Sequence, residues 1–133
     1  MNDILLSICI PTFNRSKKLT RLIESIDIKD NFELVICDDG STDNTKSVID
    51  SFSKKIKILY EYQENQGRGF ALRKAINMAR GKYVIVMDSD DYFTPDALAN
   101  IIWVLLSQKS YKSFVFGIKI FKNNALFDNL PPD

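Results

Sequence analysis

The sequence places three aspartates within four residues, Asp88, Asp90 and Asp91, with Ser89 between the first two. In an extended chain residues i and i+2 point the same way, so Asp88 and Asp90 can project into one crevice. Close carboxylates repel one another unless a cation neutralises them, and ligand sets made only of oxygen suit Mg²⁺ or Mn²⁺. The spacing therefore predicts a divalent metal site, against the alternative of an exposed acidic loop ahead of a helix.

A second acidic segment, DDGSTD, contains Asp38, Asp39 and Asp43. Gly40 within it permits a backbone conformation that other residues resist. At the end of a strand, Asp38 or Asp39 can accept hydrogen bonds from a pyrimidine base or a ribose hydroxyl, as acidic residues do in other nucleotide-binding folds. Taken alone, the segment fits a helix cap in a solvated turn equally well.

Two further segments combine polar groups with fixed positive charge. The first, PTFNR, runs from Pro11 to Arg15, and the second, NQGRG, runs from Asn65 to Gly69 ahead of a predicted helix that also carries Arg73 and Lys74. Backbone amides at a helix start favour an anion, and arginine binds phosphate oxygens with paired hydrogen bonds. The alternatives are a capped turn for the first segment and a solvated basic helix face for the second, above all for Lys74.

The sequence contains no histidine. This absence excludes imidazole general bases, serine–histidine and cysteine–histidine nucleophiles, and histidine-bound zinc. The 18 basic and 17 acidic residues give a net charge of +1, which predicts no general attraction to nucleic acid or to anionic membranes.

The remaining composition predicts one soluble, cytoplasmic domain that spans residues 1–133. No basic leader with an apolar core is present at the start, and no apolar run approaches the roughly 20 residues that cross a bilayer. Cys9 and Cys37 lie in apolar segments, so we expect reduced, buried thiols and no disulfide.

Apolar segments separated by amphipathic ones predict an alternation of strands and helices. The expected strands are Ile4–Ile10, ended by Pro11, then Phe32–Cys37, Ile56–Tyr62, Tyr83–Met87 and Ser113–Phe121, followed by an irregular tail over Lys122–Asp133.

Four helices are expected between and after these strands. The first is capped by Ser16, with its apolar stripe at Leu19, Leu22, Ile23 and Ile26, and the second carries Val48, Ile49 and Phe52. The third spans Gly67–Gly81 and ends in a left-handed cap at Gly81, and the fourth is started by Thr94, Pro95 and Asp96.

This alternation predicts an α/β fold, an open, mostly parallel Rossmann-like sheet with helices on both faces. Ligands bind such sheets at the carboxyl ends of the strands. All four polar segments follow predicted strands, so we expect them to meet at that edge.

Taken in order, SICIPTFNR, VICDDGSTDNT and ENQGRGFALRKAINMARGKYVIVMDSDD resemble the donor-binding half of family 2 glycosyltransferases, which have the glycosyltransferase-A fold. The resemblance extends from about Leu5 to Leu106. It implies transfer of a sugar from a nucleoside diphosphate donor, with UDP-sugars favoured, to a saccharide or lipid-linked hydroxyl acceptor in polysaccharide biosynthesis. It also implies an Mn²⁺ or Mg²⁺ cofactor.

The resemblance assigns roles to individual residues. Asp39 would contact the base, Asp88 would face the ribose or the sugar, and Asp90 would ligate the metal that bridges the diphosphate. The donor-binding set is Pro11, Thr12, Phe13, Asn14, Arg15, Asp38, Asp39, Gly67, Arg68, Arg73, Asp88 and Ser89, and the metal-binding set is Asp90, Asp88 and Asp91.

Family members take their catalytic base from a later part of the domain. Beyond Asp91 the sequence offers only Asp96, Asp128 and Asp133, and none is placed to deprotonate an acceptor. We therefore expect a domain truncated after its donor-binding half, with the base beyond residue 133, that binds donor but transfers sugar poorly or not at all.

Two alternatives to this reading remain. A non-catalytic nucleotide-sugar-binding module would keep the same pocket and lack the base. A nucleotidyltransferase would need a glycine-rich loop with a basic residue after the first strand, and Pro11–Arg15 contains no glycine, which makes this alternative weak.

Overall fold

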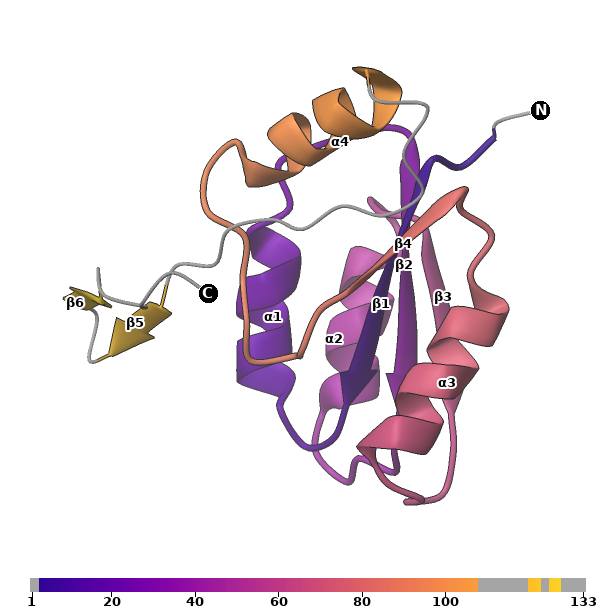
Figure 1. Ribbon diagram of the computed structural model, residues 1–133. Helices are drawn as coiled ribbons and strands as arrows, with labels where there is room; N and C mark the ends of the chain where they lie inside the picture. Colours follow the sequence, from indigo (N-terminus) through magenta and orange to yellow (C-terminus); the bar gives the residue numbers. More distant parts are fainter. Residues whose placement is uncertain (1–2, 108–119, 123–124, 128–133) are drawn as a thin grey trace.

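A computed structural model describes residues 3–107, 120–122 and 125–127. Four strands form one parallel sheet in the order β3-β2-β1-β4 (Figure 1). They are β1 (Leu6–Thr12), β2 (Phe32–Asp38), β3 (Ile58–Tyr62) and β4 (Tyr83–Val86). The predicted α/β fold with a parallel sheet is confirmed.

Four helices connect or follow these strands: α1 (Ser16–Glu24), α2 (Thr45–Phe52), α3 (Arg68–Met78) and α4 (Ala97–Ser107). Figure 1 shows α1 and α2 on one side of the sheet and α3 on the other, as predicted. None of the helices in the described ranges is long and apolar enough to cross a membrane.

The core has two layers because alternate strand residues face opposite sides of the sheet. Ile8 of β1 and Leu34 of β2 belong to the larger cluster, with apolar residues of α1, α2 and α4. Cys9 and Val35 face α3, where the small side chains of Ala71 and others let the helix lie close to the sheet. Both faces of β1 and β2 are buried, which explains their nearly continuous apolar sequence.

Both cysteines are free and buried, as expected. Burial, together with the nearby charge of Glu33, raises the pKa of Cys9 to about 11. Burial also raises the pKa of Cys37 to about 11. Both thiols therefore stay protonated near neutral pH and are poor nucleophiles.

The first strand was predicted to end at Ile10, but β1 continues through Pro11 to Thr12. The Cys9 carbonyl accepts a hydrogen bond from the Met87 amide at 3.0 Å. Pro11, two residues later, is directed to the same side, where β4 has already ended at Val86. Its missing N–H therefore removes no bond from the ladder.

The predicted cap of the first helix is wrong. Arg15 is the N-cap residue of α1 and makes no side-chain cap bond. Asp43, from the segment after β2, accepts a hydrogen bond from the Ser16 amide at 3.2 Å and another from the Thr45 amide at 3.1 Å. One carboxylate thus serves the amino ends of both α1 and α2, and the sequence of α1 alone gives no sign of it.

The fourth helix begins at Ala97, later than the predicted start at Thr94 to Asp96. The Ala97 amide bonds the Thr94 carbonyl at 3.1 Å, so these residues form a turn, and Asp96 has a positive φ of 64°. The Asp96 amide donates to the Asp27 carboxylate at 3.1 Å. This contact with a distant segment holds the chain out of the helix there.

The third helix ends at Met78, and the predicted left-handed cap at Gly81 is wrong, because Gly81 has no positive φ. The glycine is needed for a close approach instead. A Cβ atom at position 81 would lie 2.6 Å from the Ser7 hydroxyl and 2.7 Å from the Ser7 backbone nitrogen.

A buried polar network fixes this approach at the amino ends of the strands. The Gly81 amide donates to the Ser7 hydroxyl, which donates to the fully buried Glu33 carboxylate, both at 2.8 Å. Arg80 adds its backbone amide and its guanidinium to the same carboxylate. The entry of the chain into β4 is therefore tied to both β1 and β2.

The predicted strand over Ser113–Phe121 lies largely outside the described residues. Within them, β5 (Ile120–Lys122) pairs antiparallel with β6 (Ala125–Phe127). The expectation of an irregular tail over Lys122–Asp133 is therefore wrong at Lys122, the last residue of β5, and over residues 125–127, which form β6.

We expect Gly81→Ala to destabilise the fold by about 1–3 kcal/mol, because the added methyl overlaps the backbone of β1. Gly69→Ala is the matched control: a Cβ there meets nothing within 4 Å, and alanine in a helix is favoured over glycine by up to about 1 kcal/mol. Urea unfolding measures both. Equal stability of the two variants would contradict the packing of Gly81 against Ser7.

Candidate functional site

A cavity of about 480 Å³ lies at the carboxyl end of the sheet. The strand order reverses at β1, which has β2 on one side and β4 on the other, and ligands bind open α/β sheets at such a point. All four polar segments of the sequence contribute to the walls. The lining residues are Pro11, Thr12, Phe13, Arg15, Asp39, Asn65, Gly67, Arg68, Ala71, Asp88, Ser89 and Asp90.

Four of the predicted site residues, Asn14, Asp38, Arg73 and Asp91, do not line this cavity. Two lining residues were given no role from the sequence. Asn65 stands in the NQGRG segment beside the assigned glycine and arginine, so its position could have signalled it. Ala71 packs between α3 and the sheet, and its side chain carries no polar group that would have marked it.

The hydroxyl of Thr12 is buried in the cavity wall and lacks a hydrogen-bond partner among the described residues. Buried polar groups in folded proteins nearly always have a partner. The hydrogen-bonding capacity of this hydroxyl is therefore unused among the described residues.

Asp39 is almost completely buried yet remains ionised. Its carboxylate accepts hydrogen bonds from the Gln63 side chain at 2.8 Å and from the amides of Gln66 at 2.8 Å and Gly67 at 3.0 Å. Burial raises the pKa of Asp39, but these three hydrogen bonds outweigh it and leave the pKa below its usual value. Gly67 adopts a φ of 104°, a conformation that glycine tolerates, to present its amide.

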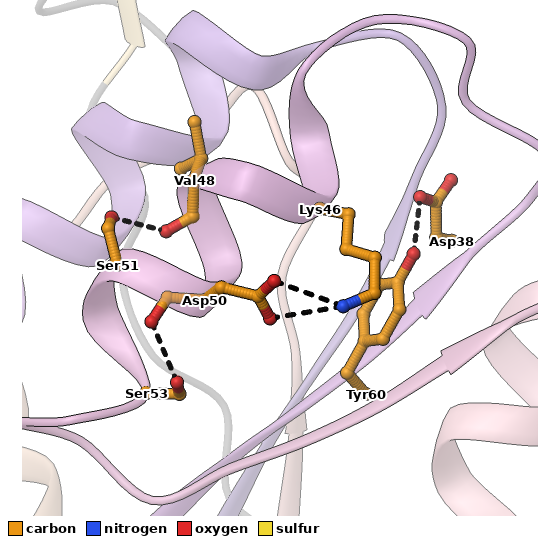
Figure 2. Close-up of polar contacts among 7 residues, drawn as sticks. All are labelled: Asp38, Lys46, Val48, Asp50, Ser51, Ser53 and Tyr60. Carbon is orange, nitrogen blue, oxygen red and sulfur yellow. Dashed lines mark hydrogen bonds and ion pairs between the residues drawn. The ribbon is translucent and has the colours of Figure 1, made fainter.

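Asp38 is fixed by the fold rather than exposed in the cavity. The Tyr60 hydroxyl donates to its carboxylate at 2.9 Å, as Figure 2 shows, and the Ser41 amide donates at 2.8 Å. Burial and this bond to Asp38 raise the pKa of Tyr60, so the hydroxyl stays protonated and remains a donor. In the same view Lys46 lies between Asp50 and the Tyr60 ring.

Asn14 joins the segments that follow β1 and β2. Its side-chain oxygen accepts hydrogen bonds from the backbone amides of Thr42 at 2.8 Å and Asp43 at 3.3 Å, and its backbone amide donates to the Ser41 hydroxyl.

Arg73 is exposed on α3. Neighbouring Lys74, expected to be solvated, pairs with Glu61 at 3.3 Å.

The aspartates of the DSDD segment converge. Asp88, Asp90 and Asp91 each offer a carboxylate oxygen, and these oxygens lie within 4.8 Å of one another. A set of three hard oxygen donors fits Mg²⁺ or Mn²⁺. Burial and the charges of Asp90 and Asp88 raise the pKa of Asp91, which shows the mutual repulsion that a bound cation would relieve.

Two arginines of the cavity wall pair with these aspartates. Nη1 of Arg15 lies 2.6 Å from Oδ2 of Asp90. Arg68 donates to Oδ1 of Asp88 through Nε at 2.8 Å and also through Nη2. Burial raises the pKa of Asp90, but the hydrogen bond and charge of Arg15 lower it by more than burial raises it. The pKa of Asp90 is therefore below its usual value. Asp90 is therefore ionised across the neutral range.

Contacts from α1 hold the acidic segment in place, and the sequence did not signal them. Arg21 donates to the Asp90 carbonyl at 2.8 Å, and its guanidinium lies 4.5 Å from the centre of the Tyr92 ring. The Ser25 hydroxyl accepts a hydrogen bond from the Phe93 amide at 2.9 Å. In the sequence Arg21 is one more basic residue on an exposed helix face.

The chain resembles known proteins in both sequence and fold. The family model for glycosyl transferase family 2 matches residues 7–124. The chain is 35% identical over 132 residues to UDP-Glc:alpha-D-GlcNAc-diphosphoundecaprenol beta-1,3-glucosyltransferase WfgD of Escherichia coli, a match that covers 95% of this chain and 50% of that protein.

Two solved structures share the fold. TarS of Staphylococcus aureus in complex with UDP-GlcNAc has a TM-score of 0.74 and 29% identity, covering 80% of this chain and 32% of that one. A mannosyltransferase of Pyrobaculum calidifontis in complex with GDP-Man and Mn²⁺ has a TM-score of 0.65 and 25% identity, covering 79% and 33%. The chain spans half or less of the length of these three proteins.

The match to the family model covers most of the chain, the matched structures have the same fold, and the polar segments that gave the resemblance meet in one cavity. The chain belongs to glycosyl transferase family 2.

Proposed function

We propose that the chain binds a nucleoside diphosphate sugar, with a UDP-sugar favoured, and forms the donor-binding part of a metal-dependent glycosyltransferase. The observation that carries the proposal is the cavity at the switch point, which brings together two arginines, the acidic cluster and the unpartnered Thr12 hydroxyl. Related proteins support the donor class, since the TarS structure contains UDP-GlcNAc and the WfgD name specifies UDP-Glc.

Within this proposal each wall of the cavity has a role. Asp39, Thr12 at the end of β1 and the segment that follows it bind the base and ribose. Arg15 and Arg68 bind phosphate oxygens, for which the guanidinium group is well shaped. Asp88 and Asp90 hold Mn²⁺ or Mg²⁺, with Asp91 as a further carboxylate of the same cluster.

A bound divalent cation would stabilise the negative charge that builds on the departing nucleoside diphosphate. The protein's own contribution is to hold the aspartates ionised and close together. Arg21 restrains the backbone at Asp90, and the hydrogen bond from Arg15 keeps the Asp90 carboxylate deprotonated.

The proposal extends to a cytoplasmic enzyme of polysaccharide biosynthesis that glycosylates a saccharide or lipid-linked hydroxyl. The acceptor would be activated by a carboxylate base from sequence beyond residue 133. These 133 residues alone would bind donor with little or no transfer.

A non-catalytic nucleotide-sugar-binding module is the second candidate. It is favoured by the cavity lining, in which the described residues include no acidic side chain other than Asp39, Asp88 and Asp90, all of which have a donor-binding or metal-binding role in this proposal. Both candidates predict binding of donor by this chain. Transfer by a longer version of the protein, assayed with a panel of hydroxyl acceptors, would support the enzyme and exclude the module.

We expect UDP to bind much more tightly in the presence of Mn²⁺, and Asp90→Asn to remove roughly tenfold or more of that enhancement by deleting a charged ligand. Isothermal titration calorimetry with UDP, GDP and TDP, each with and without Mn²⁺, measures the effect. Asp50→Asn, which breaks an exposed ion pair on α2, is the matched control. Unchanged metal-dependent binding by Asp90→Asn would contradict the proposed ligand.

We expect Thr12→Val to leave stability unchanged or slightly higher, because the hydroxyl it removes has no partner among the described residues. The same change should weaken UDP binding by roughly threefold to tenfold through loss of one hydrogen bond. Urea unfolding and calorimetry give the two readouts. A clear loss of stability with intact UDP binding would show that the hydroxyl serves the fold instead.

A further inference from the structure

We propose that Arg15 and Arg68 are exchangeable counter-ions of the metal-binding aspartates. They pair with Asp90 and Asp88 when no nucleotide is bound, and they move to diphosphate oxygens when the metal and the nucleotide bind together. The inference rests on the proposed function and adds to it a mechanism that couples the two ligands.

The pairing in the structure is specific. Arg68 uses both Nε and Nη2 on Oδ1 of Asp88, and Arg15 places Nη1 2.6 Å from Oδ2 of Asp90. Both aspartates belong to the cluster of converging carboxylate oxygens, and all four side chains belong to residues that line one cavity. The two guanidinium groups therefore neutralise carboxylates at which a divalent cation would bind.

The exposure of these pairs allows the exchange. The Arg15 and Arg68 side chains are 45% and 58% exposed, and their partners Asp90 and Asp88 are 41% and 47% exposed. Ion pairs this exposed change an equilibrium constant by only a few-fold, because water solvates the separated charges well. By contrast, separating a buried pair would leave uncompensated charges and would resist the exchange.

Electrostatics also opposes a state in which metal and arginines share the aspartates. A divalent cation on Asp88 and Asp90 would lie within a few ångströms of two guanidinium groups, and like charges at that distance repel even in water. A diphosphate beside the metal offers oxygens that accept paired hydrogen bonds from arginine. Arg15 follows β1 and Arg68 lies at the start of α3. Because the two residues belong to separate segments, each side chain can turn toward the diphosphate independently.

The exchange predicts cooperative binding. Metal alone must displace both arginines, whereas metal with nucleotide gives them new partners, so the nucleotide raises the affinity for metal. By thermodynamic linkage, the metal raises the affinity for nucleotide by the same factor.

A purely supporting role for the arginines predicts the opposite sign. If Arg15 and Arg68 served only to orient the carboxylates, as groups around a metal site often do, their loss would weaken metal binding. The effect of each arginine on the affinity for metal alone therefore separates the two accounts.

The test measures Mn²⁺ affinity in the 133-residue chain from the electron paramagnetic resonance signal of free Mn²⁺, with and without UDP. Without UDP, we expect Arg68→Ala and Arg15→Ala each to raise the affinity for Mn²⁺ by roughly threefold to tenfold. With UDP present, the enhancement of Mn²⁺ affinity by nucleotide should be smaller in both variants than in the wild type.

Lys74→Ala is the matched control, because Lys74 lies on the same helix as Arg68 but outside the cavity lining, and its loss breaks an exposed ion pair with Glu61 of β3. It should leave both affinities unchanged. Arg68→Gln, which keeps a polar side chain at the start of α3, should reproduce the effect of Arg68→Ala, and circular dichroism confirms that each variant folds.

Unchanged or weaker binding of Mn²⁺ alone by folded Arg15 and Arg68 variants would overturn the exchange. If the wild type still binds UDP and Mn²⁺ together, the proposed function survives that result. A wild-type chain that binds neither ligand would overturn the proposed function and the exchange with it.

Discussion

The parallel pairing of β1 with both β2 and β4 is the constraint on which the site depends. In this register Thr12 lies level with Asp38, and the Met87 amide bonds Cys9, so the segments after all three strands leave the sheet at one edge. The close approach of Gly81 to Ser7 fixes how the chain enters β4, at the opposite end of the strands. We expect a change there to shift the acidic segment that follows β4, although neither Gly81 nor Ser7 lines the cavity.

At the carboxyl edge of the sheet, hydrogen-bond donors and arginines compensate the negative charges of several aspartates. Buried Asp39 and exposed Asp43 both remain ionised because amides and polar side chains donate hydrogen bonds to them, and loss of solvent alone would have favoured protonation. Asp88 and Asp90 instead face arginines that are themselves exposed. Asp39 and Asp43 order the loops through these bonds, while Asp88 and Asp90 keep exposed arginine partners that, in the proposed function, a metal and a nucleotide replace. In that account Asp39 also contacts the base, so one acidic edge would serve both structure and binding.

The fold and most of the cavity lining could be predicted from the sequence because their signals are local. Apolar runs give the strands, and the segments PTFNR, NQGRG and DSDD begin at or shortly after the carboxyl ends of these strands. The predictions that were wrong or missing depend on contacts between distant residues: Asp43 caps α1, Asp27 delays α4, and Arg21 holds the Asp90 backbone. Gly81 gave a misleading local signal, since its position after a helix is typical of a cap and its actual constraint comes from β1.

The central claim is that this edge of the sheet binds a divalent cation and a nucleoside diphosphate together. Its most direct test is a crystal structure of the chain soaked with UDP and Mn²⁺, with the metal located by anomalous scattering. Our account predicts Mn²⁺ on carboxylate oxygens of Asp88 and Asp90, at metal–oxygen distances of roughly 2.0–2.3 Å, with the diphosphate beside it in the cavity. Mn²⁺ and UDP bound elsewhere, with both arginine–aspartate pairs intact, would contradict it.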